Sequence, residues 1–107
     1  MPSLLGEKIR ALRQGKKWSL ERLAALSDSS KSYLWELENQ DAPRPSAKKM
    51  AKIAEVLGVT AEFLLNETKT SPDEAVIDEA FYRKYKRMPK ETKRRLRQIL
   101  DAWEDDA

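Results

Sequence analysis

The sequence predicts an all-α protein in which five short helices are followed by a two-helix hairpin. Apolar residues recur every three or four positions along almost the whole chain of 107 residues. Strand-type alternation of apolar and polar residues is absent, and the chain has only three glycines. Residue types that begin and end helices interrupt the apolar pattern at short intervals. These observations favour short packed helices over any β architecture.

Residues 1–66 are expected to form one helical domain. Its first helix runs from about Leu4 to Gln14, and Gly15 is expected to end it. Residues suited to N-capping precede the next four helices, at Ser19, Ser30, Ser46 and Thr60. Gly58 follows the last periodic residue of the fourth helix, as a C-terminal glycine does.

A polar linker over residues 67–71 leads to a C-terminal helical hairpin over residues 72–107. Ser71 is expected to cap its first arm, because proline and glutamate follow at helix-start positions. Pro89 separates the arms. An isolated hairpin cannot bury its apolar residues, which should pack on a second copy, the N-terminal domain or another protein. Dimerisation is the preferred interpretation, through Ile77, Phe81, Tyr85, Leu96, Ile99, Leu100 and Trp103.

The composition argues against several classes of function. The chain has no cysteine and no histidine, which removes thiolate metal sites, disulfides and the commonest general base. A glycine-rich phosphate loop is also absent. We therefore expect no enzyme activity, no catalytic residue, no metal site and no cofactor. Without a signal peptide or an apolar run of roughly 20 residues, the protein is expected to be cytoplasmic and not bound to a membrane.

The stretch from Ser19 to Asn39, SLERLAALSDSSKSYLWELEN, has the pattern of two short helices that meet across a turn. Leu23 and Ala24 on the first helix face Leu34 and Leu37 on the second. This arrangement holds the second helix in the orientation needed to enter the major groove of DNA.

The chain from about residue 3 to residue 66 resembles the Xre family of Cro-type helix-turn-helix regulators, which includes lambdoid phage repressors. The matching stretches are IRALR, SLERLA, SKSYLWELEN, PSAKKMAKIAEVLGV and TAEFLL, in the family's order and spacing. The resemblance implies a five-helix, lambda-repressor-like domain that binds double-stranded DNA. Asp28 and Lys17 stand where the family has glycine, and Leu20 stands where a phosphate-binding glutamine is common. Aspartate tolerates a left-handed conformation, and Gly15 is expected to replace Lys17 as the helix stop.

The resemblance assigns the outer face of the third helix to base recognition, opposite the inward-pointing leucines. The candidate base-contacting residues are Lys31, Ser32, Trp35 and Glu36. Lysine can donate to guanine and glutamate can accept from cytosine. For Lys31 and Glu36 the alternative is a solvated helix face, and for Trp35 it is packing under a loop or against the hairpin.

Residues that flank the third helix are candidate phosphate contacts. They are Ser30, Asn39, Gln40 and Arg44. Arg13 and Glu38 look like DNA-contacting residues by type, but the resemblance assigns them to a partly buried ion pair between the first and third helices.

The basic stretch from Arg83 to Arg97 contains nine basic residues and one acidic residue, Glu91, with acidic residues on both flanks. Three interpretations remain open. The stretch is a second DNA-contacting surface, one half of a self-complementary dimer contact, or a solvated face.

The sequence therefore predicts a sequence-specific transcriptional regulator, bacterial or phage-encoded and associated with the nucleoid. We expect a dimeric repressor of a palindromic operator with half-sites about 34 Å apart, which also regulates its own promoter. The alternative is an antitoxin-like protein or an interaction module whose hairpin binds a second protein.

Overall fold

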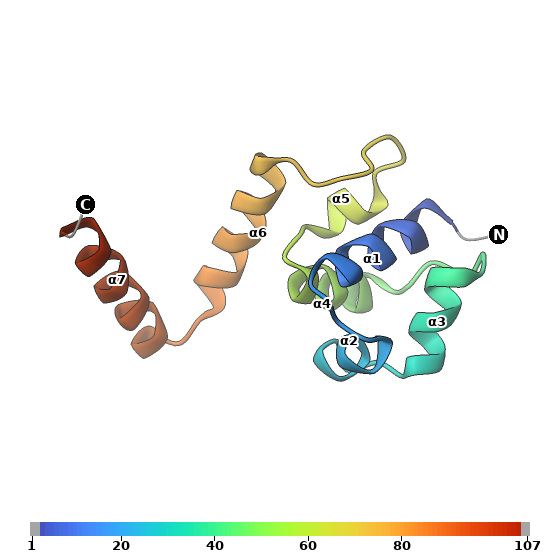
Figure 1. Ribbon diagram of the computed structural model, residues 1–107, viewed down its shortest axis with the longest axis horizontal. Helices are drawn as coiled ribbons and strands as arrows, with labels where there is room; N and C mark the ends of the chain where they lie inside the picture. The colour runs from blue at the N-terminus through green and yellow to red at the C-terminus, as the bar shows by residue number, and fades with distance from the viewer. Residues whose placement is uncertain (1–2, 106–107) are drawn as a thin grey trace.

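The computed structural model describes residues 3–105, so the outermost residues of the two predicted segments, 1–2 and 106–107, lie outside the described residues. Within residues 3–105 the fold is all-helical, as the sequence predicts. The helices are α1 (Leu4–Gly15), α2 (Leu20–Leu26), α3 (Lys31–Asn39), α4 (Ala47–Leu57), α5 (Ala61–Leu65), α6 (Glu74–Arg87) and α7 (Lys90–Asp105). Figure 1 shows α1–α5 gathered into one bundle, from which α6 and α7 extend as a V-shaped tail.

The helix starts in the bundle follow from local side-chain chemistry. Each predicted capping residue occupies the N-cap position, and its hydroxyl oxygen accepts a backbone N–H three residues along the chain. For Ser30 the donor is the N–H of Tyr33, at 3.1 Å. The predicted N-caps of α2 to α5 are therefore confirmed.

The core lies between α1 and the four helices that follow it. Its buried apolar residues are Ile9, Leu23, Ala24, Leu34, Leu37, Met50, Ile53, Ala54, Leu57, Val59, Phe63 and Leu64. Gly6 allows α1 to lie directly against α3, because a Cβ at this position would stand 2.1 Å from the carbonyl oxygen of Leu37. Because one face of α3 packs against α1, the opposite face of α3 points outward.

Two residues of the bundle other than glycine adopt the left-handed conformation. Asp28 does so with φ of 54°, which confirms the expectation for the turn before α3. Gly15 is the last residue of α1, as expected, but it does not replace Lys17 at the turn, because Lys17 itself is left-handed, with φ of 60°. The turn at Lys17 lets the N–H of Trp18 reach the carbonyl of Arg13 at 3.2 Å, and Trp18 then packs against the core.

The start of α6 also differs from the prediction. Ser71 is not its N-cap, because the helix begins after Asp73, whose carboxylate accepts the N–H of Val76 at 2.9 Å. A carboxylate at this position also interacts favourably with the helix dipole, which a serine hydroxyl does not. Lys69 further pairs with Asp73 at 3.1 Å.

Two ion pairs join α6 of the tail to the bundle. Arg83 pairs with Glu62 of α5 at 2.6 Å, and Arg87 pairs with Glu55 of α4 at 2.5 Å. Val76 packs against the edge of the core. Near the bend between the two tail helices, Arg97 donates to the Tyr85 hydroxyl at 2.6 Å.

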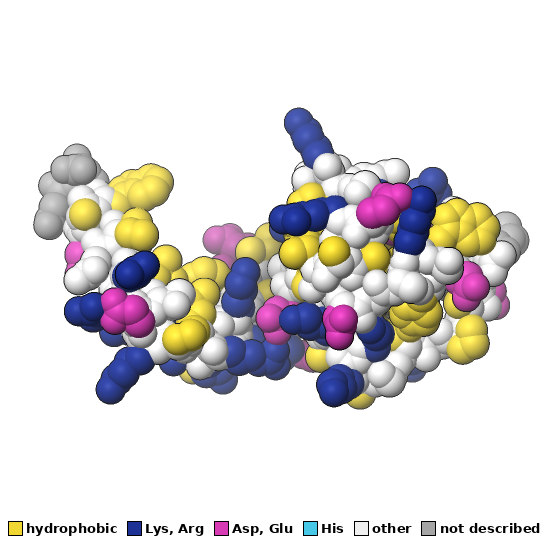
Figure 2. All heavy atoms as spheres, turned by 90° about the horizontal axis from the view of Figure 1, so that it is seen from below, with side chains coloured by type: hydrophobic (Ala, Val, Ile, Leu, Met, Phe, Trp, Pro, Cys, Tyr) yellow, Lys and Arg dark blue, Asp and Glu magenta, His cyan; other side chains and the backbone are white. Residues whose placement is uncertain are grey.

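The apolar residues of the tail remain largely exposed. Trp103 is 74% exposed and Phe81 is 54% exposed, while Tyr85 and Leu96 are partly buried. The other large exposed side chains here are Ile77, Tyr82, Ile99 and Leu100. Figure 2 shows hydrophobic side chains gathered over the tail, interspersed with lysine and arginine.

Lys8 is a buried lysine that holds the end of α5. Its side chain is only 2% exposed, and its ammonium donates to the carbonyls of Phe63, at 2.7 Å, and Asn66. The ammonium also lies 4.6 Å from the centre of the Phe63 ring. Burial lowers the pKa of the Lys8 ammonium below its usual value.

Replacing Lys8 with methionine is expected to lower the free energy of unfolding by about 1–3 kcal/mol, because two carbonyls at the end of α5 lose their donor. Urea denaturation of the full chain measures this loss. Lys16→Met is the control, since Lys16 is exposed and its ammonium lies 5.2 Å from the centre of the Trp18 ring, with no carbonyl within residues 3–105 that depends on it. Equal stability of Lys8→Met and the unaltered protein would contradict the role given to Lys8.

Candidate nucleic-acid interface

The outer face of α3 brings the four candidate base-contacting residues together. Lys31, Ser32, Trp35 and Glu36 are all exposed and line one shallow depression of about 430 Å³. Trp35 is 46% exposed, so it is not packed under a loop or against the tail. Leu34 and Leu37 are buried on the opposite side of the helix. The face thus presents a cation, a hydroxyl, an aromatic ring and a carboxylate, which together match the hydrogen-bonding and methyl groups of base edges.

An ion pair that the sequence analysis missed crosses from α2 to this face. The Lys31 ammonium lies 2.6 Å from a carboxylate oxygen of Glu21, in the first turn of α2. The hydrogen bond from Lys31 is the main cause that holds the pKa of Glu21 below its usual value. The sequence offers no pattern specific to this pair, because the contact depends on how α2 and α3 cross.

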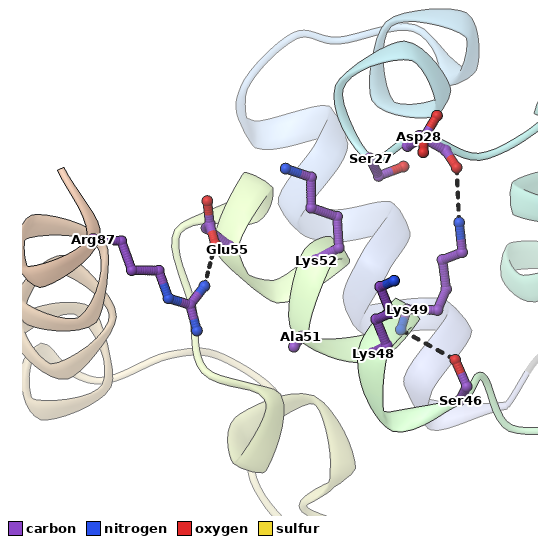
Figure 3. Close-up of a pocket in the computed structure, with 9 residues that line it drawn as sticks. All are labelled: Ser27, Asp28, Ser46, Lys48, Lys49, Ala51, Lys52, Glu55 and Arg87. Atoms are coloured by element: carbon purple, nitrogen blue, oxygen red, sulfur yellow. Dashed lines mark hydrogen bonds and ion pairs between the residues drawn. The ribbon is translucent and has the colours of Figure 1, made fainter. Parts of the chain in front are cut away.

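The turn before α3 is fastened to α4. The Lys49 ammonium donates to the carbonyl of Asp28 at 2.8 Å (Figure 3). It also donates to the hydroxyl of Ser29 at 2.9 Å. On the other side of the turn, the buried hydroxyl of Ser27 donates to the carbonyl of Leu23 at 2.7 Å. The left-handed residue Asp28 is therefore held by a contact from a distant helix, and the start of α3 is fixed with it.

Arg13 of α1 and Glu38 of α3 form a bidentate ion pair. The guanidinium donates to the two carboxylate oxygens at 2.8 and 2.9 Å, and a third N–H donates to the carbonyl of Trp18 at 2.8 Å. The side chains are 12% and 1% exposed. The hydrogen bond to Glu38 raises the pKa of Arg13 above its usual value. The pair therefore joins α1 to the end of α3, away from solvent.

The candidate phosphate-contacting residues lie at the two ends of α3. Ser30 caps its start, while Asn39 ends it and donates to the carbonyl of Trp35 at 3.0 Å. Gln40 follows as the C-cap. Arg44 is exposed in the next loop and borders a different depression, which Asp41, Asn66 and Ser3 also line.

The arginines of the basic stretch 83–97 pair largely with acidic residues of the same chain. In addition to the contacts of Arg83 and Arg87 with the bundle, Arg94 lies 2.5 Å and Arg95 3.6 Å from Glu91. A cleft of about 680 Å³ between α4 and α6 carries further lysines (Figure 3). Its lining residues are Ser27, Asp28, Ser46, Lys48, Lys49, Ala51, Lys52, Glu55 and Arg87.

Across residues 3–105, no helix has the length and apolar character needed to cross a membrane. In the same part of the chain, no three acidic, histidine or cysteine side chains are grouped as a metal site.

Comparison with known proteins gives consistent matches. A family model described as helix-turn-helix, HTH_3, matches residues 9–64. The HTH-type transcriptional regulator SinR of Bacillus licheniformis is 32% identical over 75 residues, which cover 70% of this chain and 68% of that protein. A crystal structure of SinR, the master regulator for biofilm formation, in complex with DNA is 34% identical, with a TM-score of 0.55, and covers 58% of this chain and 98% of the other. A SinR–SinI complex is 27% identical, with a TM-score of 0.58, and covers 96% of this chain and 99% of the other.

Proposed function

Because the chain belongs to the Xre/Cro-type helix-turn-helix family, as a DNA-binding transcriptional regulator similar to SinR, we propose that it is a dimeric repressor of a palindromic operator. The observation that carries the proposal is the outer face of α3, where Lys31, Ser32, Trp35 and Glu36 meet. The N-terminal part of a recognition helix is the part that contacts base edges in this kind of domain. The complex of SinR with DNA supports the same role for this chain. The relatives are named as regulators and not as enzymes.

Dimerisation through α6 and α7 completes this proposal. The bundle offers one recognition helix, and one short helix alone gives modest affinity and reads few base pairs. The exposed apolar residues of the tail are suited to pairing with a second copy. A two-fold dimer then binds two half-sites in inverted orientation, with phosphates contacted at the helix ends by Ser30, Asn39, Gln40 and Arg44. We place this activity at the nucleoid in the cytoplasm.

The proposal is tested by selecting duplexes that bind the full chain from a randomised pool. We expect the enriched duplexes to contain one short motif twice, in inverted orientation, with centres about one helical turn apart. A footprint on the DNA upstream of the protein's own gene then tests autoregulation. A pool that stays random after repeated selection would contradict sequence-specific binding, and a single unrepeated motif would contradict the dimer.

Lys31→Ala is expected to weaken binding to the selected operator by about 1–3 kcal/mol, and to weaken binding to random DNA far less. The reason is that the lysine contacts a base edge, which differs between the two duplexes. Fluorescence anisotropy titrations measure both affinities. Lys90→Ala on the tail is the control for loss of one positive charge. Equal weakening on both duplexes would assign Lys31 to a phosphate.

A second candidate function is binding of another protein by the tail. The similarity to the SinR–SinI complex covers α6 and α7 as well as the bundle, which favours this candidate. The exposed apolar residues of the tail suit a helical partner that carries an apolar stripe of its own. Such a partner would compete with the second copy of the chain and would release the operator.

A further inference from the structure

Glu21 and Lys31 form an exposed ion pair at the edge of the base-contacting face. Their side chains are 61% and 59% exposed, and the charged atoms lie 2.6 Å apart. An ion pair so accessible to water adds little to the stability of a fold. Lys31 also opens α3, where a cation is disfavoured by the helix dipole. Glu21 suits the first turn of α2, but Lys31 is not placed to stabilise the fold. What the pair fixes is therefore the position of the Lys31 ammonium.

We propose that Glu21 is a positioning residue that makes Lys31 selective for base edges over phosphates. This inference rests on the proposed function, in which α3 reads the major groove. A lysine ammonium is a compact charge on a flexible stem. When unrestrained it pairs with the nearest phosphate, and phosphates occur in every DNA sequence.

The hydrogen-bonding capacity of the ammonium fits this role. Lysine has three N–H donors, and Glu21, whose carboxylate lies 2.6 Å from the ammonium, can accept one of them. Two donors remain, and guanine presents two acceptors, O6 and N7, in the major groove. The held ammonium can therefore contact a guanine without leaving Glu21.

The charge of Glu21 acts in the same direction on DNA of any sequence. In helix-turn-helix docking, the helix before the recognition helix crosses the phosphate backbone. A carboxylate in the first turn of α2 repels these phosphates. It also pairs with the positive charge of Lys31, so that this lysine releases fewer counterions from the DNA. The pKa of the Glu21 carboxyl is held below its usual value, first by the Lys31 ammonium and then by the backbone at the start of α2. Glu21 therefore lowers the affinity for DNA of arbitrary sequence. An operator with a guanine opposite Lys31 regains this affinity through the base contact.

The test is the variant Glu21→Gln, compared with the unaltered chain on the selected operator and on a scrambled duplex. We expect affinity for the scrambled duplex to rise about 3–10-fold, with a salt dependence steeper by about one phosphate contact. Affinity for the operator should rise less, so the ratio of the two affinities falls. The control is Glu7→Gln, since Glu7 also lies in the first turn of a helix, α1, and takes no part in the Lys31 pair. It should leave the ratio unchanged.

Lys31→Met and the double variant decide whether Glu21 acts through Lys31. In the Lys31→Met background, adding Glu21→Gln should leave the affinity ratio unchanged. An unchanged ratio in the single Glu21→Gln variant, or an equal fall in the Lys31→Met background, would overturn the inference. If the unaltered chain binds both duplexes alike, the proposed function falls and takes this inference with it. If the unaltered chain prefers the operator and Glu21→Gln leaves that preference unchanged, the inference about Glu21 is overturned and the proposed function stands.

Discussion

Replacing Glu38 with alanine is expected to lower the free energy of unfolding by about 3–5 kcal/mol, the range found when one partner of a buried ion pair is removed. The Arg13 guanidinium would keep only the carbonyl of Trp18 as a partner while it is 12% exposed. Its positive charge would then lie next to the core without compensation. Chemical denaturation of the full chain, followed by circular dichroism, measures the loss.

Glu62→Ala is the matched control for this prediction. It also removes a glutamate that pairs with an arginine, but the Glu62 side chain is 67% exposed. A loss of about 1 kcal/mol or less is expected there, as for other exposed pairs. Similar losses for the two variants would show that the Arg13–Glu38 pair contributes no more than a surface contact.

Ile99→Asp is expected to convert the protein to a monomer and to weaken operator binding about 100-fold or more, since the linked second recognition helix is lost. Ile99 is 61% exposed and lies on the same stripe of α7 as Leu96, Leu100 and Trp103. A carboxylate in the centre of that stripe would have to be buried without a partner in the dimer. Analytical ultracentrifugation measures the oligomeric state, and anisotropy measures the affinity.

Gln98→Asp adds the same charge one residue away, on the other side of α7. This control should remain a dimer with nearly unchanged operator affinity. A dimer that persists in Ile99→Asp would contradict the role given to the apolar stripe. A monomeric Ile99→Asp protein with full operator affinity would instead contradict the need for two recognition helices.

The parts of the fold that depend on local sequence could be predicted well. The N-caps of α2 to α5 depend on a side chain and a backbone N–H three residues apart, so the sequence contains both partners. The left-handed Asp28 follows from the few residue types that tolerate this conformation. Burial of Leu34 and Leu37, and exposure of Trp35 between them, follow from the helical period.

The wrong expectations arose where a second partner decided the outcome. Gly15 was expected to replace Lys17 as the residue that turns the chain after α1, but Lys17 itself makes the left-handed turn and Trp18 packs against the core. Ser71 was expected to cap α6, but Asp73 is the stronger acceptor and also pairs with Lys69. Each choice involves a competition between nearby residues that spacing alone does not resolve.

The residues on the outer face of α3 could be predicted, but the contacts that position this face could not. The resemblance identified the outer residues of α3, which follow from the helix register. Lys49 reaches the turn from 21 residues away, and Glu21 meets Lys31 across a helix crossing. Neither contact has a sequence pattern of its own, because both depend on how α2, α3 and α4 pack together.

The most direct test of α3 as a sequence-reading helix is the anisotropy of the full chain on the selected operator and on its scrambled duplex, at about 50 and about 200 mM salt. Binding to phosphates weakens steeply with salt on any DNA. Base contacts differ between the two duplexes, so they keep the two affinities different. If α3 reads base edges, the preference for the operator persists at the higher salt. Equal binding to both duplexes, falling together as salt rises, would contradict this role of α3.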